Sequence, residues 1–196
     1  GLLKPYPRRK ETHMPFLQSV YAPLAGLLAA TVSLAGAAED CPEYLNQELR
    51  KLHSSDTVNL CDIARGKPLL VVNTASHCGF TPQFKGLEAL YQQYREKGLQ
   101  VVGFASDDFR QAAKDEATAA TVCYVNYGVT FTMFAPTAVK GPSANPVFAE
   151  LGQQTEPPGW NFNKYVVDAS GRVVAHFGSS TSPDSAALRA AIDSVL

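Results

Sequence analysis

The sequence has few cysteines and no close pair of them. Its 196 residues include four cysteines, all widely spaced, which argues against a zinc site and leaves redox or disulfide roles. The sequence also lacks internal repeats and low-complexity tracts, so nothing indicates a repeat architecture. Neither charge sign dominates, because 17 Lys and Arg oppose 18 Asp and Glu for a net charge of -1, and the composition gives no general attraction to nucleic acid. These absences leave one globular domain with a substantial apolar core.

An apolar, alanine-rich run at about residues 20–38 follows a basic segment at residues 8–10. With the small residues 35–38 as a cleavage site, this pattern predicts a secretory signal. We therefore expect residues 1–38 to be an upstream extension with a signal peptide, and residues 39–196 to be a periplasmic or secreted domain. The alternative is a single membrane anchor, but proline, glycine and serine interrupt the apolar run.

Export changes the interpretation of the first two cysteines, Cys41 and Cys61. Residues 1–38 carry four basic and one acidic side chain, or +3, so residues 39–196 carry -1 minus 3, or -4. In an oxidising compartment Cys41 and Cys61 are candidates for a structural disulfide. Closing that loop would contribute ~3 kcal/mol of stability. The alternative is that both remain unpaired thiols.

The strongest local signal is Cys78, which lies between an expected strand and an expected helix. The continuous apolar run 69–72 is typical of a strand buried on both faces. Small and polar residues then form a turn, and Pro82 suits the first position of a helix capped by Thr81. Amides and the dipole at a helix N-terminus favour a thiolate, so Cys78 is a candidate nucleophile. The alternative is a small buried apolar side chain.

The chain around this turn has a strand, helix and strand order. A helix at about 82–97 ends at Gly98, and an apolar strand follows at 99–105, so a parallel βαβ unit and an α/β fold are expected. A turn at 169–172 joins two further strands as a hairpin. The other expected elements are short helices at 42–53 and 147–151, a helix at 112–127, a terminal helix from Ser182 and Pro183, a strand at 57–60, and strands at 165–168 and 173–177.

The amino-acid sequence around Cys78 is more specific than its position between a strand and a helix. Residues 73–84, Asn-Thr-Ala-Ser-His-Cys-Gly-Phe-Thr-Pro-Gln-Phe, and residues 86–91, Gly-Leu-Glu-Ala-Leu-Tyr, closely resemble the active-site signature of the glutathione peroxidase family. The resemblance implies a thioredoxin-like fold, with a central mixed β-sheet flanked by helices. It also implies that Cys78 is catalytic, because the family reduces hydroperoxides with a cysteine or selenocysteine at this place.

The resemblance assigns three further catalytic residues. The family places a glutamine in the loop after the second strand, with its amide facing the sulfur, and here the candidate is Gln111. The usual glycine run is replaced by Arg110 and Gln111, with one residue fewer, and the alternative for Gln111 is a helix cap. A Trp-Asn pair completes the family tetrad, which assigns Trp160 and Asn161 as donors to the sulfur and the leaving oxygen. The alternative for Trp160 is core packing.

The segment at 123–131 also resembles the family, in which a cysteine at this helical position is the resolving thiol of thioredoxin-linked members. Cys123 is therefore the expected resolving cysteine, and the alternative is a buried helix cysteine. We interpret His77 and His176 as surface or packing residues, and no metal or cofactor is implied.

The expected function is a peroxidase that reduces hydrogen peroxide and organic, including lipid, hydroperoxides through Cys78. A thioredoxin-like dithiol or glutathione would return the oxidised Cys78 to its thiol form. We expect a role in the response to oxidative stress, and we favour a monomer. The first rival is a thiol-disulfide oxidoreductase of the same fold, which needs Cys-x-x-Cys where position 81 is Thr. The second is a thioredoxin-like copper carrier, which needs a second thiol and a histidine near Cys78.

Overall fold

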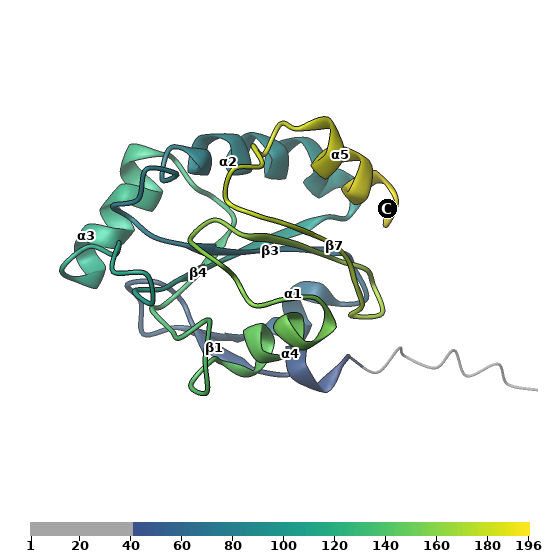
Figure 1. Cartoon of the computed structure of the whole chain (residues 1–196), viewed down its shortest axis with the longest axis horizontal. Coiled ribbons are helices and arrows are strands. Elements are labelled where there is room, and N and C mark those ends of the chain that lie inside the picture. The colour runs from purple at the N-terminus through teal and green to yellow at the C-terminus, as the bar shows by residue number, and fades with distance from the viewer. Residues whose placement is uncertain (1–40) are drawn as a thin grey trace, which may run out of the picture. The chain divides into compact units, whose positions relative to one another are not determined.

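The computed structural model describes residues 41–196, so the predicted signal at 1–38 lies outside the described residues. A mixed five-stranded sheet in the order β5-β4-β3-β6-β7 forms the centre (Figure 1). The strands β3 and β4 are parallel, as are β4 and β5, whereas β6 is antiparallel to both β3 and β7. Their bounds are β3 (Leu69–Thr74), β4 (Gln100–Ala105), β5 (Thr132–Phe134), β6 (Lys164–Val167) and β7 (Val173–Phe177). The expected mixed sheet flanked by helices is confirmed.

Helices cover both faces of this sheet (Figure 1). One face carries α2 (Gln83–Tyr94), the 3-10 turn η2 (Arg95–Lys97), α3 (Glu116–Ala120), the π-helix η3 (Thr121–Asn126) and α5 (Ala186–Asp193). The other face carries η1 (Glu43–Leu45), α1 (Leu60–Ala64) and α4 (Pro146–Gln154). The strand β3 is buried on both faces, as predicted, because Leu70 and Val72 pack under α2 while Leu69 and Val71 pack toward α4.

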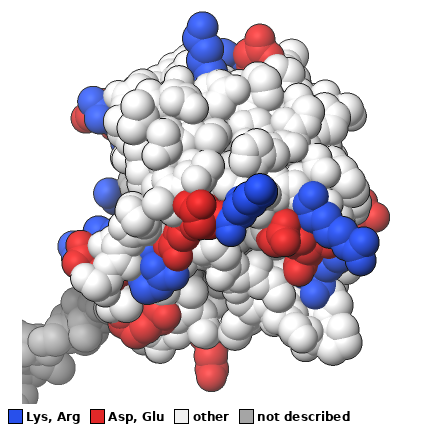
Figure 2. Space-filling view, turned by 90° about the vertical axis from the view of Figure 1, so that its left-hand side faces the viewer, with Lys and Arg blue, Asp and Glu red and all other residues white. Residues whose placement is uncertain are grey.

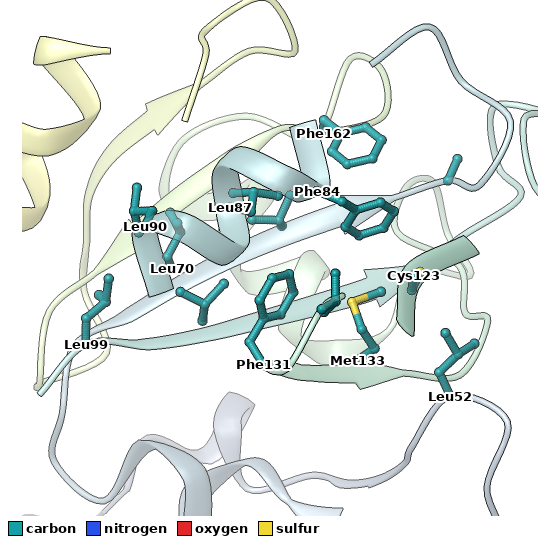
Figure 3. Packing of buried hydrophobic residues seen from close by; sticks show 14 of the residues in the cluster. Leu52, Leu70, Phe84, Leu87, Leu90, Leu99, Cys123, Phe131, Met133 and Phe162 are labelled. Atoms are coloured by element: carbon teal, nitrogen blue, oxygen red, sulfur yellow. The ribbon is translucent and has the colours of Figure 1, made fainter. Parts of the chain in front are cut away.

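The apolar cluster under α2 has Phe84 near its centre (Figure 3). The Phe84 ring meets Phe162 edge to face at 5.2 Å between centroids, and it lies 5.9 Å from Tyr127. The cluster also contains both free cysteines, Cys78 and Cys123. A single apolar core therefore connects the β3–α2 turn, the π-helix and the segment before β6.

The predicted βαβ unit is present as β3, α2 and β4, with a small correction at the start of the helix. The helix begins at Gln83, and Thr81 does not cap it. The Thr81 hydroxyl is bonded inside the preceding turn instead, to the Cys78 amide and the Ala75 carbonyl. At the other end Gly98 adopts φ +106°, as its predicted role at the end of the helix requires.

The predicted helix at 42–53 is wrong. After η1 the chain forms β1 (Glu48–Arg50), which pairs antiparallel with β2 (Thr57–Asn59). The same segment bonds to the strand β5 region, since the Leu52 amide donates to Met133 and the Arg50 carbonyl accepts from Ala135. Pairing with distant residues therefore outweighs the local helical pattern.

Other helix boundaries also differ from expectation. The helix expected at 112–127 begins only at Glu116, where Asp115 caps α3, and it continues as the π-helix η3. The terminal helix begins at Ala186 with Ser185 as its cap, after the expected Pro183 start. Strand β5 was not predicted, and the helix expected at 147–151 extends over the length of α4.

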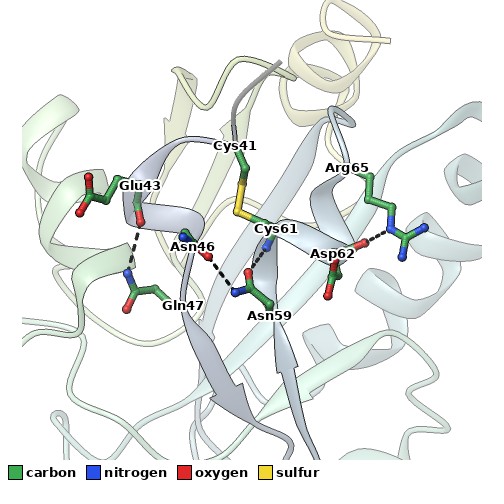
Figure 4. Close-up of a disulfide and its surroundings, with 8 residues drawn as sticks. All are labelled: Cys41, Glu43, Asn46, Gln47, Asn59, Cys61, Asp62 and Arg65. Atoms are coloured by element: carbon green, nitrogen blue, oxygen red, sulfur yellow. Dashed lines mark hydrogen bonds between the residues drawn. A yellow bond between two sulfur atoms is a disulfide. The ribbon is translucent and has the colours of Figure 1, made fainter. Parts of the chain in front are cut away.

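A disulfide joins Cys41 to Cys61, with the two Cα atoms 5.8 Å apart (Figure 4). Asn59 caps α1 by accepting a hydrogen bond from the Cys61 amide at 2.9 Å, and its own amide donates to Asn46 at 2.8 Å. The disulfide therefore ties the start of the described chain to the first turn of α1.

Acidic and basic side chains lie interspersed in a band across the face that carries α3 (Figure 2). One ion pair involves Glu116, the first residue of α3. Two guanidinium nitrogens of Arg50 donate to its carboxylate, each at 2.8 Å. Neither charge sign dominates this face. Over residues 41–196, no helix has the length and apolar content needed to cross a membrane.

Candidate active site

The Cys78 thiol lies in a tight turn between β3 and α2. The Cys78 amide donates to the Thr81 hydroxyl at 2.9 Å, and that hydroxyl donates to the Ala75 carbonyl at 2.9 Å. The Phe80 amide donates to the Cys78 sulfur at 3.4 Å. Only 7% of Cys78 is exposed. An amide donor and the positive end of α2 both favour negative charge on this sulfur.

The loop after β4 lies against this turn. The His77 amide donates to the Gln111 carbonyl at 2.8 Å, and the Ala113 amide donates to the Ser76 hydroxyl at 2.7 Å. Arg110 adopts φ +56° at the place where the family usually has glycine. The Gln111 side-chain amide donates to the Arg110 carbonyl at 3.1 Å, so its backbone is beside Cys78 but its amide is not bonded to the sulfur.

The segment before β6 is fastened to the end of β3 through Asn73, five residues before Cys78. The Asn73 carbonyl accepts from the Phe162 amide at 2.7 Å, and its side chain bonds the Trp160 carbonyl at 2.9 Å and the Asn163 amide at 3.0 Å. The Trp160 ring, 40% exposed, packs on Phe109 at 5.2 Å. Hydrogen bonds and aromatic packing thus bring the loops that carry Cys78, Gln111 and Trp160 to one end of the sheet.

Asn161 has an unusual environment for an amide side chain. It is fully buried, and neither its Nδ2 nor its Oδ1 atom has a hydrogen-bond partner among the described residues. Its main chain is fixed, because its carbonyl accepts from the Ser179 hydroxyl at 2.5 Å. Buried polar atoms without partners are rare in proteins, and a catalytic role is one explanation for them.

Lys164 is a residue of this region whose role sequence reasoning missed. It is completely buried, and its ammonium donates to the Phe162 carbonyl at 2.7 Å. Burial lowers the pKa of Lys164 to about 8. Phe162 itself adopts φ +59°, a left-handed conformation that costs a bulky residue ~1–3 kcal/mol. The signal was available, since a lysine directly precedes the apolar residues Tyr165 to Val167 in a strand.

Cys123 lies in the π-helix η3, and it is the only buried residue of that helix. It is a free thiol, not bonded to Cys78. Burial raises the pKa of the Cys123 thiol to about 12. It lines a cavity of about 230 Å³ together with Ser76 of the β3–α2 connection and Phe84 of α2. π-Helical turns are uncommon and often mark functional positions.

The two histidines differ in setting. His77 is exposed, whereas His176 stacks on Tyr165 at 4.3 Å between ring centroids. The His176 Nε2 atom bonds the Asn163 side chain at 2.8 Å, its Nδ1 atom lies 3.4 Å from Glu156, and burial lowers the pKa of its imidazole. His176 is therefore packed, as predicted, and it supports the segment next to Trp160. Residues 41–196 contain no cluster of three or more potential His, Cys, Asp or Glu metal ligands.

The comparison with solved structures places this fold among thioredoxin-like proteins. The crystal structure of Trgpx in its apo form matches with a TM-score of 0.60 at 27% identity, over 78% of this chain and 94% of that one. A secreted disulfide oxidoreductase of Mycobacterium tuberculosis matches with a TM-score of 0.56 at 16% identity, over 79% of this chain and 99% of that one. The second likeness concerns the fold alone, because the residue at position 81 is Thr.

The sequence comparisons are more specific. The glutathione peroxidase family model matches residues 45–152. A glutathione peroxidase of Lactococcus lactis is 41% identical over 67% of this chain and 87% of its own length. A glutathione peroxidase-like peroxiredoxin of Chlamydomonas reinhardtii is 48% identical over 62% and 79%. A hydroperoxy fatty acid reductase of Synechocystis is 41% identical over 61% and 78%.

Proposed function

This chain belongs to the glutathione peroxidase family and is a peroxidase, and from that premise we propose that Cys78 is the residue that reduces the hydroperoxide. The observation that carries this assignment is the hydrogen bond from the Phe80 amide to the Cys78 sulfur at the start of α2. A sulfur that accepts an amide hydrogen bond there is stabilised as the thiolate, which is the nucleophilic form.

The chemistry follows from that thiolate. The Cys78 sulfur attacks one peroxide oxygen, so that a sulfur–oxygen bond forms and the oxygen–oxygen bond breaks. The sulfur loses two electrons and becomes a sulfenic acid, and the departing alkoxide or hydroxide takes up a proton to leave as alcohol or water.

Asn161 and Trp160 are proposed as the donors to the charge that develops in this step. The Asn161 amide is supported by its burial without a partner, which leaves Nδ2 free for a reacting oxygen. Trp160 is supported by its position on the same segment, held through Asn73. Gln111 completes the set if its amide turns from the Arg110 carbonyl toward the sulfur.

Hydrogen peroxide and organic hydroperoxides, including those of lipids, are the proposed substrates. The Synechocystis relative is named for hydroperoxy fatty acids, which supports an organic substrate. An exposed apolar surface supports it too, because the Trp160 ring, 40% exposed, rests on Phe109.

A thioredoxin-like dithiol is the proposed reductant, with glutathione as the alternative. The Cys123 thiolate would attack the sulfenic sulfur, forming a sulfur–sulfur bond and expelling hydroxide, which takes up a proton to leave as water. The dithiol would then reduce that disulfide by two electrons. Relatives named peroxiredoxins support this choice. The physiological setting that we propose is protection against oxidative stress, by a monomer.

Export to the periplasm or beyond the cell is also part of the proposal. It is supported by the Cys41–Cys61 bond, since structural disulfides persist in oxidising compartments and are rare in the cytosol.

Steady-state consumption of hydrogen peroxide and an organic hydroperoxide, each with thioredoxin and with glutathione systems, tests the proposed function. We expect consumption that Cys78→Ser abolishes and that the thioredoxin system sustains better. Unchanged consumption by Cys78→Ser, with the protein folded, would show that another group reacts. Stoichiometric binding of copper(I) together with no peroxide consumption would favour the copper carrier.

A further inference from the structure

Lys164 places a positive charge in the interior beneath the proposed active site. It opens β6 and pairs with Val72 of β3 on one side and with Phe177 of β7 on the other. Paired residues share a face of the sheet, so the Lys164 side chain lies on the face covered by α2. That face also carries Cys78 and Phe84.

The ammonium of Lys164 has little to balance its charge. No salt bridge reaches it within the part of the chain that the structure describes. The facing strand β3 has no titratable side chain. On α2, Lys85 is exposed and Glu88 is bonded to Thr130, while His176 of β7 lies on the opposite face of the sheet. The remaining titratable groups in or against the apolar cluster of this face are the thiols of Cys78 and Cys123 and the phenols of Tyr91, Tyr94 and Tyr127.

Among residues 41–196 the ammonium makes one hydrogen bond, and its partner is a strained residue. Phe162 is buried at φ +59°, and it is held from two sides, because its amide donates to the Asn73 carbonyl and its carbonyl accepts from Lys164. A backbone conformation that is costly for an aromatic residue persists only where its surroundings enforce it. The residues directly before this turn are Trp160 and Asn161.

We infer that Lys164 is a positioning residue of the peroxidase site: its buried ammonium holds the left-handed turn at Phe162, and that turn presents Trp160 and Asn161 to the reacting sulfur of Cys78. The role rests on the proposed function of Cys78. A charge-assisted hydrogen bond is stronger than a neutral one, which explains a lysine here in place of an apolar strand residue. The lowered pKa of Lys164, about 8, places the loss of this charge within an accessible range of pH.

The test compares Lys164→Met, which removes the charge at similar length, with Lys164→Arg, which keeps charge and donors. Lys67→Met is the matched control, because Lys67 is exposed before the opposite end of β3. Two quantities are measured on the full chain: the rate constant for Cys78 oxidation by hydrogen peroxide, and acrylamide quenching of Trp160. The sequence has only this tryptophan, so its fluorescence reports the turn without any peroxide chemistry.

For Lys164→Met we expect an oxidation rate constant lower by ~10-fold or more and a Trp160 ring more accessible to acrylamide, with partial rescue by Lys164→Arg and no change in Lys67→Met. The ratio of the wild-type to the Lys164→Met rate constants should fall as pH rises through about 8, because the neutral amine is a weaker donor.

An unchanged rate constant together with unchanged Trp160 quenching in Lys164→Met would overturn the positioning role. If that variant does not fold, Lys164→Gln, which keeps a donor without charge, is measured in the same way. Failure of wild-type Cys78 to react with peroxide would refute the proposed function instead, and the Trp160 quenching would still decide whether Lys164 holds the turn.

Discussion

Thr81 closes the turn that holds Cys78, because its hydroxyl accepts from the Cys78 amide at 2.9 Å while it donates to the Ala75 carbonyl at 2.9 Å. A thiol-disulfide oxidoreductase would have its second cysteine at position 81. Here the position supplies two buried hydrogen bonds, which fix the Cys78 backbone and leave the sulfur to the Phe80 amide.

Thr81→Val should therefore destabilise the protein although the side chains have the same shape. The substitution leaves the Cys78 amide and the Ala75 carbonyl without a partner, and each loss costs roughly 1–3 kcal/mol. Urea unfolding should show a free energy of unfolding lower by about 2–6 kcal/mol. Thr81→Ser keeps the hydroxyl and should stay close to wild type. A loss below about 0.5 kcal/mol in Thr81→Val would mean that these bonds contribute little.

The Cys41–Cys61 bond should stabilise the fold without contributing to the chemistry. The two cysteines are 20 residues apart in sequence and link the segment before η1 to α1. Cys41→Ser/Cys61→Ser should lower the free energy of unfolding by ~3 kcal/mol while Cys78 reacts with peroxide as before. Intact-mass analysis of exported protein after alkylation should show this pair protected while Cys78 is labelled. Labelling of Cys41 without reductant would contradict both the bond and the proposed export.

Local pattern was sufficient for the centre of the fold. The apolar run of β3, the periodic face of α2 and Gly98 after it depend on neighbours in sequence, and they were predicted within a residue or two. Long-range pairing was invisible to the same reasoning. The segment with Arg50 and Leu52 has a helical pattern, but its backbone bonds to residues more than 80 positions away.

The sequence predicts which residues form the site better than it predicts how their side chains are arranged. The residues Cys78, Gln111, Trp160 and Asn161 were selected from a resemblance, and the structure brings their loops together through His77 and Asn73. The direction of the Gln111 amide and the left-handed turn at Phe162 depend on packing that no local pattern encodes. The π-helical form of η3 also has no signal in the sequence.

Trp160→Phe should reduce peroxide reactivity and leave stability nearly unchanged. Phenylalanine keeps an aromatic contact with Phe109 but removes the indole N–H donor. Since the ring is 40% exposed, little core packing is lost. Stopped-flow oxidation of Cys78 should be ~10-fold slower or more. If stability falls and the oxidation rate does not, Trp160 is a packing residue only.

Stability should depend on pH through Lys164. Burial lowers the pKa of Lys164 from 10.5 in the unfolded chain to about 8 in the folded protein. Between those values the unfolded chain binds more protons, so folding becomes more favourable as pH rises, and below about 8 the charged form costs about 3 kcal/mol. The free energy of unfolding of wild type relative to Lys164→Met should therefore rise by about 3 kcal/mol from neutral pH to about 10.5. A difference that does not change with pH would show that the ammonium has an ordinary pKa.

In the proposed mechanism, Cys123 decides which reductant the enzyme uses. Its thiol is 3% exposed and its pKa is raised to about 12, so it cannot attack while η3 keeps its present form. A disulfide with Cys78 also needs the two Cα atoms within ~7 Å. Local opening of η3 would meet both conditions at small cost, because Cys123 is the only fully buried residue of this helix, while Val125 is 75% exposed.

Cys123→Ser should therefore separate the two halves of the reaction. The first oxidation of Cys78 should keep its wild-type rate, because Cys123 takes no part in it, whereas steady-state turnover with thioredoxin should be abolished. Cys78 should then accumulate as sulfenic acid and oxidise further to sulfinic acid, which mass spectrometry detects. Cys123→Ala is the second variant, which excludes any role for the serine hydroxyl. Full turnover with thioredoxin in both variants, or the absence of a Cys78–Cys123 linked peptide after peroxide treatment of wild type, would rule out the resolving role. A one-cysteine mechanism with glutathione or another small thiol would then account better for the turnover, since such a thiol would have to reach the Cys78 sulfenic acid directly without any opening of η3.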